Sequence, residues 1–199
     1  MATLWKSDRA AEWQAALDSY PAVIDAQGVA RLAELDRWYR EDLPAAIAGR
    51  RTPHVTHDEL VRVTEWKMAR GIFRPRNLVL VRGNPPETVV KTSTAALAAI
   101  PDSRRPIALL AELDGVGPAT ASAIAAAAAP DIYPFFDELV GAQVPGLGTV
   151  AFTPAYYAKY AAALRDRAEK LGAPWTPSTV EQALWAHVGG KAGTRKSKA

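Results

Sequence analysis

Hydrophobic residues recur at the spacing of an α-helix along nearly the whole of this 199-residue chain. The first clear run stops before Pro44 and consists of Leu32, Leu35, Trp38 and Tyr39. Thr56 and Glu59 form a capping box that opens the next helix, whose hydrophobic positions are Leu60, Val63 and Trp66. The one strand-like run, residues 78–81, is too short and too isolated to predict a sheet. The sequence therefore predicts an all-α fold.

Two more helices are expected to begin at Thr-Pro pairs, at residues 153–154 and 176–177, where a capping hydroxyl precedes a first-turn proline. Gly172 and Gly189 are expected to end them. These elements predict one helical domain over residues 1–188, which could also divide into two small lobes near residues 44–53. Residues 189–199 hold four cations, three glycines and no acid, and are expected to form a flexible basic tail.

A glycine-rich turn divides the segment 109–129 into two predicted helices. Gly115 and Gly117 can adopt backbone conformations closed to residues with a Cβ atom, so the loop can turn sharply and bring its amides close to a ligand. The second helix is expected to begin at about Pro118, with its unpaired amides and positive dipole end pointing into the loop. Such a loop can hold a phosphate, or it can be only a tight connection between helices.

Asp137 stands in a candidate catalytic segment, residues 130–141, directly after an aromatic cluster. Tyr133, Phe135 and Phe136 could wall a pocket, although aromatic residues beside a proline turn are more often core. A carboxylate beside such a pocket can stabilise positive charge that develops on a substrate. Asp137 also stands where aspartate often caps a short helix by accepting from its first amides. The sequence leaves both roles open.

The run from Leu113 to Ala121 (Leu-Asp-Gly-Val-Gly-Pro-Ala-Thr-Ala), with Asp137 twenty positions after Gly117, resembles the helix-hairpin-helix superfamily. It is most similar to the base-excision DNA glycosylases of the endonuclease III and adenine glycosylase group. The resemblance implies a helix-hairpin-helix glycosylase-like fold that holds double-stranded DNA by its phosphates, without regard to base sequence. The residues that the resemblance places in this contact are Gly115, Val116, Gly117, Ala119 and Thr120.

The resemblance also implies that Asp137 is catalytic. Cleavage of an N-glycosidic bond builds positive charge on the sugar, and a nearby carboxylate stabilises that charge and orients water. Members of the group that also nick the strand carry a lysine two residues after the second hairpin glycine, where this chain has Ala119. The resemblance therefore implies a monofunctional DNA N-glycosylase of base excision repair, with water as the nucleophile. Lys67 or Lys91 could substitute only if the fold carried one of them to the sugar.

Cofactor chemistry is restricted by the absence of cysteine from the chain. Several members of the group bind an iron–sulfur cluster through four cysteines, so no such cluster is possible here, and neither is a disulfide. We expect no cofactor, and a monovalent cation at the hairpin is left open. The three histidines lack the spacing of metal ligands, so no metal is expected.

Residues 67–82 carry five cations and no acid. The candidates for DNA contacts among them are Lys67, Arg70, Arg74 and Arg76. Trp66 and Phe73 interleave with these cations, a mixture that stacks on bases and pairs with phosphates. Trp66 is thus a fourth candidate wall of a base pocket. The alternative is a solvated helix face whose arginines pair with acids such as Glu59 and Glu65, and an anionic small molecule would use the same residues.

Glu65 is a second candidate catalytic carboxylate. It lies on the helix before the basic run, in a place loosely similar to that of the pocket acid in adenine glycosylases, where a general acid protonates the leaving base. The ordinary role of such a residue is a surface ion pair. Unchanged activity of a Glu65→Gln variant would exclude the catalytic role.

The net charge of +3 at pH 7 comes from the basic tail. No apolar stretch is long enough to span a bilayer, and the amino terminus lacks the apolar core of a secretion signal. We therefore expect a cytoplasmic protein without a membrane partner. Besides a glycosylase, the sequence leaves open a non-catalytic DNA-binding module of the same fold and a helical protein that binds an anionic ligand or a partner.

Overall fold

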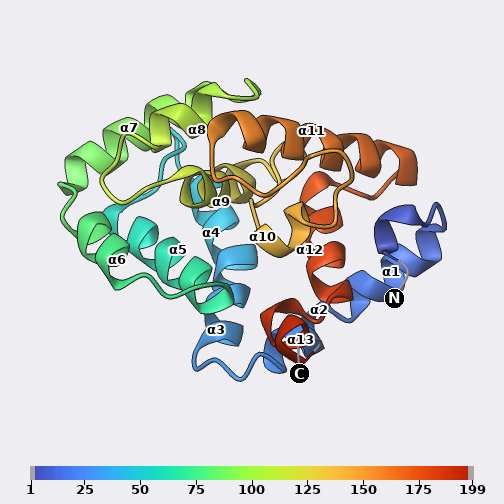
Figure 1. Cartoon of the computed structure of the whole chain (residues 1–199). Helices are drawn as coiled ribbons and strands as arrows, with labels where there is room; N and C mark the ends of the chain where they lie inside the picture. Colours follow the sequence, from blue (N-terminus) through green and yellow to red (C-terminus); the bar gives the residue numbers. More distant parts are fainter. Residues whose placement is uncertain (1–2, 197–199) are drawn as a thin grey trace.

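The computed structural model describes residues 3–196, and every regular element in that range is helical, which confirms the all-α prediction (Figure 1). The first elements are η1 (Leu4–Lys6), α1 (Ala10–Asp18), α2 (Tyr20–Asp25), α3 (Leu32–Arg37), η2 (Trp38–Asp42), α4 (Leu43–Ala48) and α5 (His57–Arg70). They are followed by α6 (Pro75–Arg82), α7 (Pro86–Ala98), α8 (Arg105–Leu110) and α9 (Pro118–Ala128). The last are α10 (Glu138–Gly141), α11 (Pro154–Leu171), α12 (Pro177–His187) and α13 (Gly190–Lys196).

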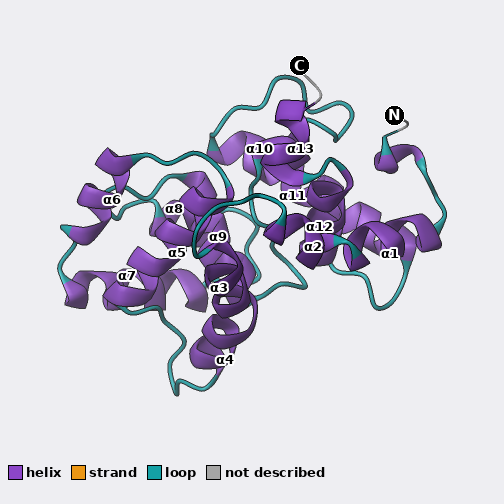
Figure 2. Ribbon diagram, turned by 90° about the horizontal axis from the view of Figure 1, so that it is seen from below, coloured by secondary structure: helices purple, strands orange, loops and turns teal. Residues whose placement is uncertain are grey.

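The helices gather in two lobes, which both views show (Figures 1 and 2). One lobe holds α3 to α9, and the other holds α1 and α2 from the start of the chain with α11 and α12 from its end. The Arg167 guanidinium on α11 fastens the amino-terminal segment, because it donates to the Trp5 carbonyl at 2.9 Å and pairs with Asp8 at 3.1 Å. Since α3 packs on α5 and α4 packs on α9, the chain passes between lobes at residues 26–31 rather than near residues 44–53.

The alanine-rich helix α9 forms the centre of the molecule. It begins at Pro118, as predicted, and every side chain from Ala119 to Ala127 is buried. Small side chains let neighbouring backbones come close, and the Tyr39 hydroxyl donates directly to the carbonyl of Ala123 at 2.7 Å. The hairpin therefore leads directly into the most buried helix of the fold.

The predicted helix starts are confirmed at three caps. Thr56 and Glu59 form the expected capping box, and Thr153 and Thr176 accept from the third residue of their helices. Gly172 caps the end of α11 with a φ of +77°, a conformation that favours glycine. Residues 78–81 lie within α6, which agrees with the absence of a predicted sheet.

The carboxyl-terminal segment differs from the flexible tail that the sequence predicted. Its residues 190–196 form α13, which is held at its start by Gln27, whose side chain accepts from the Ala192 amide at 2.9 Å. Residues 197–199, with Lys198, lie outside the described part of the chain. Within residues 3–196, no helix combines the length and the hydrophobicity that crossing a bilayer requires.

Candidate functional site

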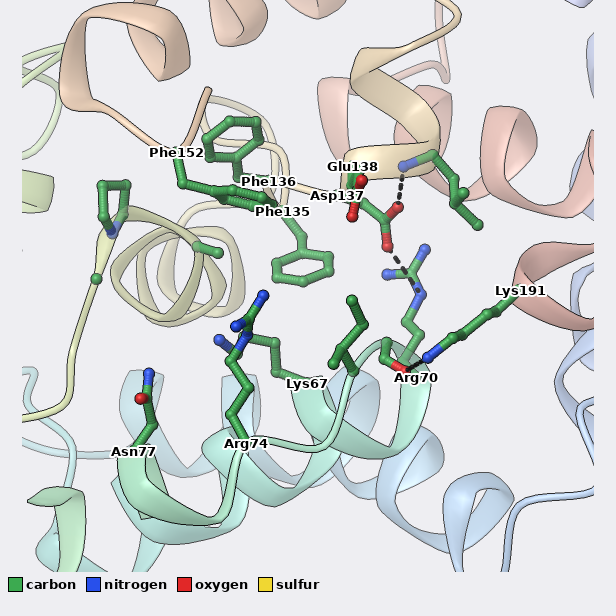
Figure 3. Close-up of a pocket in the computed structure, with 16 residues that line it drawn as sticks. Lys67, Arg70, Arg74, Asn77, Phe135, Phe136, Asp137, Glu138, Phe152 and Lys191 are labelled. Atoms are coloured by element: carbon green, nitrogen blue, oxygen red, sulfur yellow. Dashed lines mark hydrogen bonds and ion pairs between the residues drawn. The ribbon is translucent and has the colours of Figure 1, made fainter. Parts of the chain in front are cut away.

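A cavity of about 650 Å³ lies where α5, the start of α9 and the segment leading into α10 meet (Figure 3). The lining residues that the sequence had singled out are Lys67, Arg70, Arg74, Gly117, Ala119, Phe135, Phe136 and Asp137. Its wall is completed by residues that the sequence had not singled out for a site, among them Asn77, Glu138, Phe152 and Lys191. The fold thus gathers most of the candidate site residues from three separate stretches of the chain.

The hairpin between α8 and α9 is fixed from the side of α6. Gly115 has a φ of +76°, and a Cβ atom there would lie 2.6 Å from the carbonyl oxygen of Asn77, so only glycine permits this approach. The Asn84 side chain exchanges two hydrogen bonds of 2.9 Å with the backbone of Asp114. Val116 is buried in the core. The loop is therefore held in one shape before any ligand binds.

The amino-terminal end of α9 faces the cavity. Gly117 is its cap residue and, having no side chain, offers no acceptor to the first amides of this eleven-residue helix. Gly117, Pro118 and Ala119 all line the cavity, whereas Thr120 is buried behind them. Free amides and the positive end of the helix dipole together favour an anion at this wall.

Three buried hydroxyl groups position the backbone that leads to Asp137. Tyr157 and Tyr160 of α11 donate to the carbonyls of Pro134 at 3.1 Å and of Phe135 at 2.7 Å. Burial raises the pKa of both tyrosines far above the usual value, so they remain donors. The Phe136 amide donates to Ser122 of α9 at 2.9 Å. Sequence reasoning missed these supports, because a tyrosine at a helical spacing gives no sign of its hydrogen-bond partner.

The Asp137 carboxylate has two structural contacts within the site. One oxygen, Oδ1, accepts from the Leu139 amide at 2.8 Å and so caps α10, which is the alternative role that the sequence left open. The other, Oδ2, lies 3.9 Å from Nε of Arg70. Although only 9% of the residue is exposed, the carboxylate lines the cavity. A capping role and contact with a ligand are therefore compatible in this geometry.

Arg70 lies beneath the cavity rather than on an outer surface. It is fully buried, its Nη2 donates to Oε1 of Glu181 at 2.5 Å, and its guanidinium stands 4.4 Å from the centre of the Trp185 ring. Burial opposes the charge on Arg70, but Glu181, Tyr20 and Asp137 together raise its pKa above the usual value. Its Nε and Nη1 have no hydrogen-bond acceptor among the described residues. Arg70 is thus a fixed cation behind the carboxylate of Asp137.

Lys67 and Arg74 supply positive charge on the opposite side of the cavity. Figure 3 shows both side chains rising from the side of α5 toward Phe135, across from Asp137. Within residues 3–196, neither has an ion-pair partner. Burial lowers the pKa of Lys67, and the neighbouring Arg74 guanidinium lowers it further. Arg76 is exposed and does not line this cavity.

Besides Arg76, Gly115, Val116 and Thr120, three more predicted site residues are absent from the cavity lining. Glu65 is paired with Arg82 at 2.9 Å and is not among the cavity residues, so the surface ion pair describes it better than the catalytic role. Trp66 is fully buried, stacked on Tyr39 with ring centres 3.6 Å apart, and belongs to the core. Tyr133 is likewise buried.

The aromatic wall of the cavity lacks the predicted Trp66 and Tyr133 and includes one aromatic residue that the sequence did not predict. It consists of Phe135 and Phe136 together with Phe152, whose ring centre lies 5.0 Å from that of Phe136. Phe152 is 46% exposed. No periodic signal marks it in the sequence, because it stands in the irregular segment before α11.

In the described part of the chain, no group of three or more histidine or acidic side chains is arranged to hold a metal ion. Comparison with protein-family models, curated proteins and solved structures gives no match to this chain. The arguments about function therefore depend on the cavity itself.

Proposed function

We propose that this protein binds double-stranded DNA through its hairpin and acts as a monofunctional DNA N-glycosylase on a damaged or mispaired base. The observation that supports the proposal most is the meeting of Asp137 with the amino-terminal end of α9 in one cavity. A carboxylate beside an anion-binding helix end suits a substrate whose sugar becomes positive next to its own phosphates.

Each part of the cavity has a role in this reaction. The free amides of α9, with Lys67 and Arg74, hold backbone phosphates that flank the target nucleotide. The extruded base enters the cavity against Phe135 and Phe136, whose π-faces replace part of the stacking lost from the duplex. The volume of the cavity, about 650 Å³, lies within the range of small-molecule binding sites.

Asp137 stabilises the positive charge that develops on the sugar as the base departs, and it orients the water that attacks C1′. Nε of Arg70 lies 3.9 Å from Oδ2 of Asp137 and so places a buried positive charge beside the carboxylate. Glu65 lies outside the cavity, so protonation of the leaving base is not assigned to it. Glu138 is the other carboxylate among the lining residues and is exposed to solvent.

One observation favours a second candidate, a non-catalytic DNA-binding module. Both oxygens of Asp137 already have structural neighbours, the Leu139 amide and the Arg70 guanidinium. A carboxylate that only capped α10 would have the same contacts. The two functions share the hairpin and the cations, and they differ in whether Asp137 acts on a substrate.

The test uses labelled duplexes that carry uracil, alkylated, oxidised or mispaired bases, followed by hot alkali to reveal abasic sites. Base removal from one of these duplexes, lost in Asp137→Asn, is the expected result. No base removal across the panel, with duplex binding intact, would overturn the glycosylase and leave the binding module. Binding itself should weaken steeply as salt rises, and no binding at low salt would exclude both candidates.

A further inference from the structure

Asp137 shares Arg70 with a second buried carboxylate, that of Glu181. Glu181 stands on α12, is fully buried and does not line the cavity. Its Oε1 accepts from Nη2 of Arg70 at 2.5 Å. Oδ2 of Asp137, in contrast, lies 3.9 Å from Nε of Arg70, beyond the length of a hydrogen bond (Figure 3). Arg70 is therefore bound to Glu181 and only adjacent to Asp137.

One face of α12 holds the Arg70 guanidinium in place. Trp185 follows Glu181 by one helical turn, so both side chains lie on the same face of α12. The guanidinium stands 4.4 Å from the centre of the Trp185 ring and 5.2 Å from that of Phe135. Stability alone does not account for the ion pair, because replacement of a buried pair by apolar residues of similar volume is often neutral or stabilising.

This arrangement leaves one oxygen of Asp137 for a ligand. Oδ1 accepts from the Leu139 amide, whereas Oδ2 accepts no hydrogen bond within residues 3–196. A charge-assisted hydrogen bond from Arg70 would occupy Oδ2, and Nε and Nη1 of Arg70 have no acceptor among the described residues. Arg70 could shorten its 3.9 Å distance to Oδ2 only by moving, and the contact with Glu181 opposes that movement.

We propose that Glu181 is a positioning residue: by binding Arg70, it keeps Oδ2 of Asp137 available to the substrate. The inference rests on the proposed function, because it concerns the carboxylate that assists departure of the base. Arg70 then contributes positive charge beside Asp137 without occupying its oxygen. Since Glu181 acts through Arg70, its effect on the rate should disappear when Arg70 is removed.

The test replaces Glu181 by glutamine, which keeps the size of the side chain and one acceptor but removes the charge. Asp137 then becomes the only charged ion-pair partner of Arg70 among the described residues. We expect Arg70 to move to Asp137, so that a crystal structure of Glu181→Gln shows the distance from Nε to Oδ2 shortened from 3.9 Å to the length of a hydrogen bond.

The rate of base removal by Glu181→Gln is measured on the damaged duplex that serves as substrate, with protein in excess. The maximal single-turnover rate should fall by at least about tenfold, and the protein concentration that gives half of it should stay unchanged. A purely structural defect would instead lower the folded fraction, which raises the half-saturating protein concentration and leaves the maximal rate unchanged.

A double variant tests whether Glu181 acts through Arg70. Arg70→Met combined with Glu181→Gln removes the cation that would occupy Oδ2, and it removes both charges of the buried pair together. We expect this variant to remove the base at least about fivefold faster than Glu181→Gln alone. Glu169→Gln, which changes an exposed carboxylate on α11, is the matched control and should keep the wild-type rate.

The wild-type protein provides a check that needs no variant to fold. NMR coupling across hydrogen bonds should connect the Arg70 guanidinium to the Glu181 carboxyl group and not to that of Asp137. Coupling to Asp137 would overturn the inference. So would an unchanged distance between Arg70 and Asp137 in Glu181→Gln, a rate of that variant within about threefold of wild type, or a double variant no faster than it. If the wild-type protein removes no base, the proposed function fails and this inference with it, whereas base removal with any of these results overturns the inference alone.

Discussion

Two substitutions at Asp137 separate its capping role from its proposed catalytic role. Asparagine keeps a side-chain oxygen that can accept from the Leu139 amide, but it removes the charge that faces the cavity and Arg70. Alanine removes both the acceptor and the charge. The two variants therefore both lack the carboxylate, but only the asparagine variant keeps an N-cap acceptor.

The magnitudes follow from these contacts. Loss of an N-cap acceptor costs about 1 kcal/mol, and asparagine is as good a cap as aspartate, so only Asp137→Ala should lower the free energy of unfolding by that amount. Arg70 keeps its closer partner Glu181, at 2.5 Å, in both variants. Removal of one preorganised electrostatic group typically lowers a rate by about 10²–10³-fold, and we expect this loss of base removal in both variants.

Urea unfolding measures the free energy of unfolding. The rate of base removal is measured under single-turnover conditions on the duplex that the lesion panel identifies as substrate. Duplex affinity at fixed salt is the control, because the hairpin and the cations are unchanged. Base removal by Asp137→Asn within about threefold of the wild-type rate would refute the catalytic role, since that change is far below the expected effect of the charge. Asp137 would then be a helix cap alone.

Four other substitutions test the surroundings of the site. Gly115→Ala should lower the free energy of unfolding in urea by about 1–2 kcal/mol or more, because Gly115 has a φ of +76° and the new Cβ would meet the Asn77 carbonyl. Gly117→Ala should leave the free energy of unfolding nearly unchanged, because a Cβ atom there meets no atom within 4 Å. Glu181→Ala should cost about 3–5 kcal/mol by the same measurement, because it leaves Arg70 charged and buried. Glu65→Gln should leave the rate of base removal unchanged, and a loss would show that Glu65 reaches the substrate.

Local rules of sequence were sufficient for much of the fold. The caps at Thr56, Thr153 and Thr176 depend on residues three positions apart, so they can be predicted without tertiary contacts. The same holds for the start of α9 at Pro118, since a first-turn proline fixes its own φ. These elements were predicted correctly because their causes lie within one helical turn.

Positions set by distant contacts were predicted less well. Trp66 belongs to the core because its indole donates to Asp36 at 2.8 Å, across thirty positions of sequence, and aromatic character alone does not show this. Residues 190–196 of the predicted tail form α13, whose Ala192 amide donates to the remote side chain of Gln27. Phe152 lies in the cavity wall because the irregular segment before α11 passes beside the cavity. In each case the partner that decides the position is remote in sequence.

The distance along the chain from Gly117 to Asp137 has a simple geometric explanation. The chain runs along α9 for eleven residues, which at about 1.5 Å per residue carries it about 16 Å from the cavity. It turns at residues 129–132 and returns through the irregular segment 133–137, whose five residues can span the same length at about 3.3 Å each. The hydrogen bond from the Phe136 amide to the Ser122 hydroxyl connects this returning segment to α9.

This return links the two halves of the site through one buried helix. The first amides of α9, whose residues line the cavity, and the Ser122 hydroxyl, which accepts from the residue before Asp137, belong to the same buried helix, within two turns of each other. A change in the length of α9 would therefore move Asp137 away from the hairpin by about 1.5 Å for each residue inserted or removed, and would also rotate it by about 100° around the helix. The position of the Asp137 carboxylate relative to the amino-terminal end of α9 is thus set by contacts in the core.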